Sequence, residues 1–344
     1  MTVNENINAN QNGNKNSLFH MNTRDQAVRP MDLAGLKPSP SLELLKSDFP
    51  EWILFDSLRN NLKSLTDLRE HHLGFSEDSD YSLPLRGLSI GSPKTEAPSL
   101  FLVGGVHGLE RIGTQVVLAW LTSLTHQLKW DRSLHQLLEN LRIVILPMVN
   151  PLGILRKTRA NPNGIDLMRN APPSYFNLSE NLLTKNTEPQ FSWASPLRSL
   201  AQGHFWSPQL PWYKGTSLQS ELGALMQLFN LELSGSQCVF SLDCHSGFGF
   251  QDRIWFPYSG SHRAFYHLPE MQAMTQIFEA SYPHHIYRFE PTAQAYTIQG
   301  DIWDYLYLQF RREQPKDLFI PLTLEMGSWL WVKKNPWQIL NILG

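Results

Sequence analysis

The chain has 344 residues, of which 42% are apolar and 17% charged, and its formal net charge at pH 7 is -2. Such a chain is long enough to bury a sizeable core in one large α/β domain or in two ordinary ones. The near-neutral charge and the lack of a polybasic run give no reason to expect nucleic acid or a membrane as a partner. No apolar stretch reaches the ~18 residues of a membrane-spanning helix.

The first residues differ in composition from the rest. Residues 1–30 are polar, rich in Asn and without periodicity, which predicts a disordered leader before a single domain over residues 31–344. The leader lacks the charged-then-apolar order of a secretory signal. Cys238 and Cys244 lie six residues apart in one predicted strand, ~20 Å along it, too far for a disulfide. We therefore predict free thiols and a cytoplasmic location.

Apolar periodicity predicts alternating helices and strands. In chain order these are helical residues 41–69 with a break near Pro50, strand 81–90, strand 99–106, helix 111–128, strand 142–146, helix 221–233, strand 238–244, helix 269–280 and strand 319–325. Pro84 favours an edge position for the first strand, whereas the later strands are almost continuously apolar, as expected when both faces are covered. This order predicts a three-layer α/β/α domain with a mixed, mostly parallel central sheet.

One long segment breaks the alternation. Residues 150–173 are rich in Pro, Gly, Asn and Arg and show no periodicity. A loop of this length inside a compact domain is usually functional.

Two imidazoles and a carboxylate lie at the ends of predicted strands. His107 and Glu110 follow the apolar run 99–106, and His245 ends the run 238–244. Glycines at 104, 105 and 108 permit a turn in which the first two converge. Catalytic zinc takes three protein ligands of these types and keeps a fourth position for water. Asp243 shares a strand face with His245 and is either a further ligand or a partner of that histidine.

Other interpretations of the same residues are weaker. An isolated H-x-x-E is often an ordinary pair at the start of a helix. The glycine-rich turn resembles a nucleotide-binding loop, but the run from Gly104 to Gly108 does not supply the G-x-G-x-x-G spacing that approaches a pyrophosphate. Together with the distant His245, metal binding accounts for more of the pattern.

Taken in order, these motifs resemble the zinc carboxypeptidase family related to pancreatic carboxypeptidase A. The resemblance runs from about Leu83 to Trp331 and implies one zinc ion held by His107, Glu110 and His245. It also implies that Glu325, on a late strand, is the catalytic carboxylate that activates the zinc-bound water. Residues 31–344 are then the catalytic domain.

The segment between the ligands resembles the substrate-binding stretch of that family. Arg159 matches the arginine that polarises the scissile carbonyl, and Arg169 matches the arginine that binds the terminal carboxylate of the substrate. The asparagine beside that second arginine is replaced by Met168, which cannot donate a hydrogen bond to a carboxylate. Asn170 is a further candidate for substrate binding, with a role in holding the loop as its alternative.

The position of the family's mobile substrate tyrosine has two candidates. Tyr296 lies a few residues before Gly300, but an ungapped match places Ala295 at that position. Side-chain preference is open as well, because Ile302 favours an apolar residue at the pocket floor and Asp301 favours a basic one.

The predicted function is zinc-dependent hydrolysis of a peptide or peptide-like amide bond near a free carboxylate. Two alternatives stay open. The first is a zinc-dependent deacylase of small N-acyl amino acids, which the loss of the amide at Met168 favours. The second is a catalytically silent zinc-binding domain, against which the presence of Glu325 argues. The expected partner is the peptide or small amide substrate, and the sequence names no protein partner.

Overall fold

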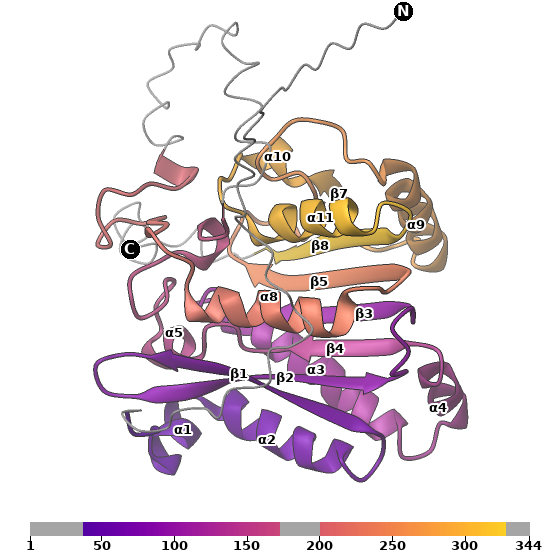
Figure 1. Ribbon diagram of the computed structural model, residues 1–344, viewed down its shortest axis with the longest axis horizontal. Coiled ribbons are helices and arrows are strands. Elements are labelled where there is room, and N and C mark those ends of the chain that lie inside the picture. The colour runs from indigo at the N-terminus through magenta and orange to yellow at the C-terminus, as the bar shows by residue number, and fades with distance from the viewer. Residues whose placement is uncertain (1–36, 173–199, 328–344) are drawn as a thin grey trace, which may run out of the picture. The chain divides into compact units, whose positions relative to one another are not determined.

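The computed structural model describes residues 37–172 and 200–327, all of them within the second of two units into which the chain divides, 1–36 and 37–344. An eight-stranded mixed sheet runs through this unit in the order β1-β2-β4-β3-β5-β8-β6-β7 (Figure 1). The strands are β1 (Leu68–Glu77), β2 (Ser82–Gly91), β3 (Ser99–Gly104), β4 (Arg142–Leu146), β5 (Cys238–Ser246), β6 (Arg253–Phe256), β7 (Arg288–Pro291) and β8 (Leu318–Met326).

The centre of the sheet is parallel and its flanks are not. Strands β4, β3, β5 and β8 run in one direction, so their carboxyl ends lie at the same edge of the sheet. Strand β2 pairs antiparallel with β4, and β6 pairs antiparallel with β8. The predicted mixed sheet is confirmed, and its parallel block is what brings residues from distant parts of the sequence together.

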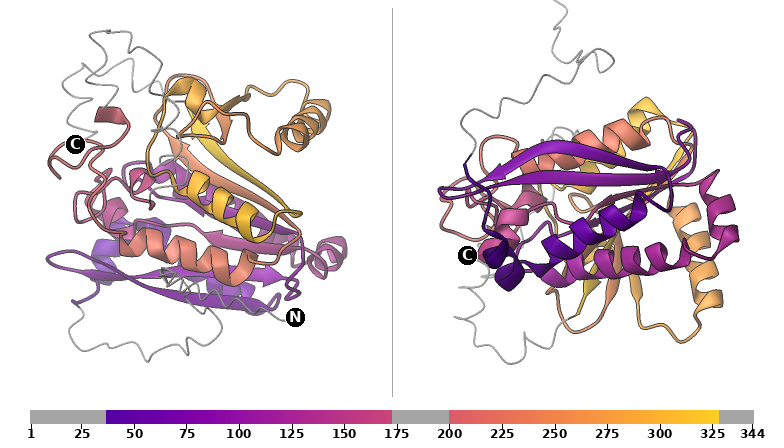
Figure 2. Two further views of the ribbon diagram at one scale, coloured as in Figure 1. Left: turned by 45° about the horizontal axis from the view of Figure 1, so that its top comes forward. Right: turned by 90° about the horizontal axis from the view of Figure 1, so that it is seen from below.

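Helices cover both faces of the sheet (Figure 2). On one face, α3 (Arg111–Gln127) packs on the strands and α2 (Pro50–Leu62) packs on α3, with Phe55 and Leu118 among the fully buried side chains. On the other face, α8 (Ser220–Leu233) and α11 (Ile302–Glu313) bury a second cluster that includes Phe229 and Phe310. Each such side chain contributes ~1.5–3 kcal/mol by burial, and the two clusters confirm the three-layer domain.

The remaining helices are short or peripheral: α1 (Leu42–Asp48), α4 (Arg132–Leu138), α5 (Pro151–Arg156), the 3₁₀ turn η1 (Leu167–Arg169), α9 (Leu268–Ser281) and α10 (Thr292–Ala295). Side-chain caps define several starts. Asp301 accepts hydrogen bonds from the backbone N–H groups of Trp303 and Asp304 at the start of α11. Such a cap satisfies donors that have no partner within the helix and is worth ~1 kcal/mol.

The strand predicted at the edge is not the outermost one. Strand β1, which the sequence analysis does not predict, lies outside β2. Its residues are mostly polar and half-buried, so they carry no apolar run. Pro84 is tolerated in β2 because β4 pairs only with Leu88–Gly91 and does not reach the proline.

The other differences between the predicted and the observed elements lie in short or irregular segments. The supposed loop 150–173 contains α5 and η1, and the short strands β6 and β7 and helix α11 are also absent from the prediction. The proposed leader, residues 1–30, lies outside the described residues. Within the described ranges, no helix combines the length and the apolar character needed to cross a membrane.

Candidate metal centre

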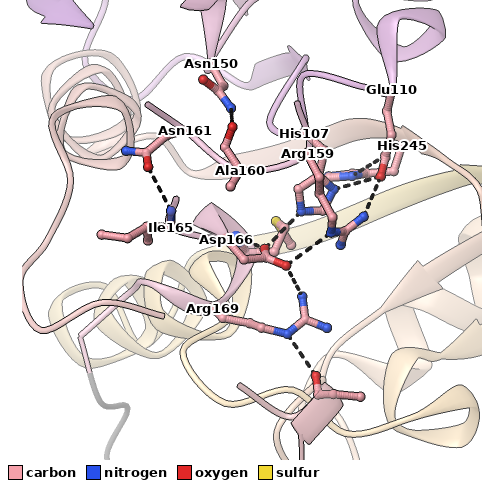
Figure 3. A network of polar contacts seen from close by, with 12 residues as sticks. His107, Glu110, Asn150, Arg159, Ala160, Asn161, Ile165, Asp166, Arg169 and His245 are labelled. Carbon is pink, nitrogen blue, oxygen red and sulfur yellow. Dashed lines mark hydrogen bonds and ion pairs between the residues drawn. The ribbon is translucent and has the colours of Figure 1, made fainter. Parts of the chain in front are cut away.

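The parallel strands place the predicted ligands at one edge of the sheet. His107 and Glu110 follow β3 and lead into α3, and His245 lies near the end of β5. Glu325 on β8 stands directly opposite His245 in the β5–β8 register. The convergence predicted for His107, Glu110 and His245 is therefore present (Figure 3), and these three can hold a metal ion, since one ligand atom from each lies within 4.8 Å of the others.

Two glycines permit the close packing that brings Glu110 to His245. A Cβ atom at Gly113, in the first turn of α3, would lie 2.0 Å from the carbonyl oxygen of Cys244 on β5. A Cβ atom at Gly108 would lie 2.0 Å from the backbone carbon of Gly153. Any larger residue would push the turn between β3 and α3 away from its neighbours, so glycine is required at both positions.

Glu110 faces both imidazoles through the same ring nitrogen of each. Its Oε1 lies 2.9 Å from Nδ1 of His107, and its Oε2 lies 3.1 Å from Nδ1 of His245. Oε2 also accepts a hydrogen bond from the backbone N–H of Ser246, at 3.0 Å. The two Nδ1 atoms and the carboxylate therefore converge on one point, as a three-ligand metal centre requires.

The outer nitrogen of each imidazole contacts a second carboxylate. Nε2 of His107 lies 3.0 Å from Oδ1 of Asp166, and Nε2 of His245 lies 2.7 Å from Oδ2 of Asp243. Asp243 thus contacts His245 on the side away from Glu110. Partners of this kind orient metal-binding histidines and raise their basicity. Burial acts to lower the pKa of His245, but the charges of Asp243 and Glu110 outweigh it and raise that pKa.

Both predicted arginines lie in the same network. Arg159 donates from its NH1 nitrogen to Glu110 at 3.0 Å and from Nε to Asp166 at 3.2 Å. Arg169 donates from its NH1 nitrogen to Asp166 at 2.8 Å and from Nε to the carbonyl oxygen of Ala201 at the same distance (Figure 3). Carboxylates of the chain itself hold the two guanidinium groups beside the candidate metal ligands.

Glu325 is buried and only partly satisfied. Its Oε2 atom has no hydrogen-bond partner among the residues that the structure describes. Burial, together with the negative charge of Glu110, raises the pKa of Glu325 to about 8. A carboxylate in this state is suited to accept and return a proton near neutral pH.

The charges of the cluster fit a divalent cation. Four carboxylates, those of Glu110, Asp166, Asp243 and Glu325, interact with two guanidinium groups, which leaves two negative charges when both imidazoles are neutral. Buried charge without compensation is costly, so the excess must be balanced by protons or by a metal ion. A donor set of two imidazole nitrogens and one carboxylate fits zinc.

Tyr296 borders this network. Its ring stacks on Phe248 with centroids 5.4 Å apart and meets the edge of Trp255 at 5.8 Å. Burial raises its pKa to about 12, and the charges of Arg169 and Glu325 also act on it. The phenol is therefore protonated at neutral pH and lies on the side of the site where the two arginines gather.

Asn170 has its polar atoms engaged with the backbone. Its Nδ2 donates to the carbonyl oxygens of Lys214 and Ser217, both at 2.8 Å, and its Oδ1 accepts from the N–H of Gln219 at 2.8 Å. These contacts favour the alternative in which Asn170 holds the loop. Its predicted contact with substrate stays a prediction.

Sequence reasoning gave too little weight to two residues. No role is assigned to Asp166 from the sequence, yet it contacts His107 and both arginines. None is assigned to Trp303 either, yet its indole N–H donates to Oδ2 of Asp243 at 2.9 Å. The available signal for Asp166 was its place three residues before Arg169. No local pattern marked Trp303, because its partner lies sixty residues away.

The structure thus combines a three-layer α/β/α domain with a candidate three-ligand metal centre at one edge of its sheet. The family comparison agrees and is more specific, because residues 78–329 match the zinc carboxypeptidase family. The chain belongs to this family, whose members are metallopeptidases that use zinc. The matched region includes all three candidate ligands, Glu325 and both arginines.

Individual relatives resemble the chain over shorter stretches. Carboxypeptidase SOL1 of Arabidopsis thaliana is 27% identical over 175 residues, which cover 48% of this chain and 34% of the relative. Carboxypeptidase 2 of Trichophyton rubrum is 34% identical over 102 residues, covering 28% of this chain and 18% of the relative. The chain thus spans about a third or less of the length of these relatives.

Solved structures share the fold at low sequence identity. Bovine thrombin-activatable fibrinolysis inhibitor, in a complex with tick carboxypeptidase inhibitor, is 20% identical with a TM-score of 0.55, covering 80% of this chain and 84% of the other. Carboxypeptidase A from Helicoverpa armigera is 17% identical with a TM-score of 0.53, covering 78% and 62% of the respective chains. These likenesses support the architecture.

Proposed function

We propose that this chain is a zinc-dependent, metallocarboxypeptidase-like hydrolase that cleaves a peptide or peptide-like amide bond near a free carboxylate. The observation that carries the proposal is the placement of Glu325. Its buried carboxylate, with one unpartnered oxygen, stands opposite His245 at the candidate metal centre formed with His107 and Glu110. The family assignment supports the same chemistry.

His107, Glu110 and His245 would hold the zinc ion. Zinc bound by three such ligands supplies a water of lowered pKa and polarises a carbonyl group. Glu325 takes the proton from the attacking water and later delivers it to the leaving amine. Burial raises the pKa of its carboxyl group above the usual range, and a general base and acid works best when its pKa is close to the working pH.

The arginines stabilise and orient the substrate. Arg159, beside Glu110, donates to the oxyanion that develops on the scissile carbonyl, a contribution often worth ~3 kcal/mol per donor. Arg169 binds the free carboxylate through its planar fork. Both now contact Asp166, which sets their positions, so a substrate meets arginines that are already oriented.

Tyr296 is the second group that we assign to the substrate. Its protonated phenol faces the region of Arg169 and Glu325, where it can donate a hydrogen bond to a substrate carboxylate or amide. This contact compensates in part for Met168, whose side chain is buried and offers no donor.

A deacylase of small N-acyl amino acids is the second candidate. The buried Met168 favours it, because one leg of C-terminal recognition is missing. A direct test compares blocked dipeptides that carry a free C-terminus with N-acetyl amino acids, using zinc-loaded wild type and Glu325→Gln. Turnover of the dipeptides that disappears in the variant supports the proposal. Turnover of N-acetyl amino acids alone would select the deacylase, and equal inertness of both proteins would select a silent zinc-binding domain.

We further propose a reducing, cytoplasmic location, with the peptide or small amide substrate as the expected partner. Cys238 and Cys244, the two cysteines of the sequence, are both free thiols. Burial raises the pKa of both thiols, that of Cys244 to about 12, so neither is activated as a nucleophile or easily oxidised. Fractionation of cells that express the tagged chain tests the location.

A further inference from the structure

Asp243 contacts a candidate metal ligand through one carboxylate oxygen only. It lies on β5 and its side chain is fully buried. Its Oδ2 is 2.7 Å from Nε2 of His245, while its Oδ1 has no hydrogen-bond partner among the described residues. A buried carboxylate retained for the fold alone is expected to have both oxygens satisfied, because an unsatisfied buried acceptor costs ~1–3 kcal/mol.

The same carboxylate oxygen accepts a second hydrogen bond from a different layer of the domain. The indole N–H of Trp303 donates to Oδ2 of Asp243 at 2.9 Å. Trp303 lies in the first turn of α11, which begins at the Asp301 cap, and its ring packs edge-on against Phe101 at 6.0 Å. Helix α11 therefore fixes the indole, the indole fixes Asp243, and Asp243 fixes the ring of His245.

The contact determines which nitrogen of His245 faces the metal centre. Oδ2 of Asp243 lies 2.7 Å from Nε2, so this nitrogen is turned away from the candidate metal centre. The other nitrogen, Nδ1, points toward Glu110 and is the atom available for a metal ion. His107 has the same arrangement with Asp166 on its outer side. In each case the second carboxylate holds the orientation of the ring.

We propose that Asp243 and Trp303 act as a positioning pair that presents Nδ1 of His245 to the metal ion. The proposal rests on the zinc site of the proposed function, but it concerns metal affinity and not peptide turnover. Neither residue contacts the substrate in this role, and both act through His245.

Zinc affinity of the purified chain tests the proposal. The variants are Asp243→Ala, Asp243→Asn and Trp303→Phe, and the dissociation constant for zinc is measured at one fixed pH by competition with a chromophoric chelator. We expect Asp243→Ala to weaken zinc binding by roughly 10–100-fold, as the loss of such partners does elsewhere. Asp243→Asn keeps a neutral acceptor and should recover part of the affinity. Trp303→Phe removes one hydrogen bond and should cost about fivefold.

Matched controls separate positioning from general damage to the core. Asp304→Asn alters another buried carboxylate on α11, one that accepts hydrogen bonds from the backbone N–H groups of Ser259 and Gly260. Trp255→Phe removes an indole N–H that donates to Glu290, away from the ligands. Both controls should bind zinc within about twofold of wild type. Thermal unfolding of every metal-free variant reports any loss of fold.

A second readout follows the geometry of the ligand itself. The visible absorption of the cobalt-substituted protein reports the coordination of the ion, and Asp243→Ala should shift its bands while Asp304→Asn leaves them unchanged. Unchanged zinc affinity in folded Asp243→Ala would overturn the role of Asp243, and unchanged affinity in Trp303→Phe would overturn that of Trp303. Wild type that binds one zinc per chain yet cleaves no peptide would count against the proposed function alone.

Discussion

Two buried clusters of charge, one beside the amino end of β4 and one at the carboxyl ends of β3 and β5, differ in how they are balanced. Around Glu232 of α8, the carboxylate meets Arg69 at 3.3 Å, Arg142 at 3.4 Å and His71 at 3.0 Å. Burial acts to raise the pKa of Glu232, but hydrogen bonds from His71 and Arg69 outweigh it and lower that pKa to about 2. This cluster is satisfied by the chain itself and ties β1 and β2 to α8.

The cluster at the metal centre has the opposite character. Its carboxylates outnumber its guanidinium groups, one oxygen each of Asp243 and Glu325 lacks a partner among the described residues, and the pKa of Glu325 is raised to about 8. Both clusters are buried, so burial does not distinguish them. The difference lies in charge balance, which marks the first as a structural element and the second as a site that can take up protons or a metal ion.

Of the variants that test this difference between the two clusters, removal of the candidate zinc ligands should have the largest effect. The double variant His107→Ala, His245→Ala loses two of three ligands, so we expect the wild-type content of one zinc per chain to fall to near zero, with no residual turnover. Elemental mass spectrometry of the purified proteins measures the zinc content. If the variant retained stoichiometric zinc, the ion would be bound elsewhere in the chain.

Glu325→Gln should come next, because it removes the proton carrier and leaves the ligands in place. Loss of a general base and acid typically reduces turnover by roughly 10²–10⁴-fold. We expect kcat to fall by this factor while zinc content stays at one per chain. A variant with near-normal kcat would assign proton transfer to another group.

The contribution of the Glu232 cluster to the free energy of unfolding should depend on pH and not on bound metal. A carboxylate whose pKa is depressed in the folded state contributes stability above its unfolded pKa of about 4.5, and this contribution is lost as the pH falls toward 2. The shift corresponds to about 3 kcal/mol in the free energy of unfolding. Urea unfolding should show Glu232→Gln less stable than wild type at pH 7, with the difference closing at low pH. If the difference in stability between the two proteins stayed constant from pH 7 to low pH, ionisation of Glu232 would not be coupled to folding.

Of the four predicted changes, Arg169→Met should have the smallest effect. It should also be the one that depends most on the substrate. A charge-assisted hydrogen-bond pair contributes ~1.5–3 kcal/mol, so KM for a peptide with a free C-terminus should rise by roughly 10–100-fold. The same peptide with an amidated C-terminus should be affected little, because it offers no carboxylate. Steady-state kinetics on the matched pair of peptides test this role. A general disturbance of the site through Asp166 would instead impair the cleavage of both peptides equally.

The sequence by itself determined the elements that carry a local signal. Apolar runs identified β3, β4, β5 and β8, since strands covered on both faces must be apolar throughout, and the spacing of His107, Glu110 and His245 indicated the metal centre. Glu325 was assigned by motif order and lies where that order implied. The strand signals are local, whereas the candidate ligands and Glu325 were recognised from several short motifs in order along the chain.

Only the tertiary structure decided which strands pair and which distant side chains contact one another. Strand β1 is half-polar and gains its place at the edge only through pairing with β2, which no local pattern reports. The contacts of Asp166 with His107 and of Trp303 with Asp243 join residues about sixty positions apart, so their existence depends on sheet order and helix packing. The excess of negative charge is likewise a property of the assembled site, because it can be counted only once distant carboxylates and arginines lie within reach of one another.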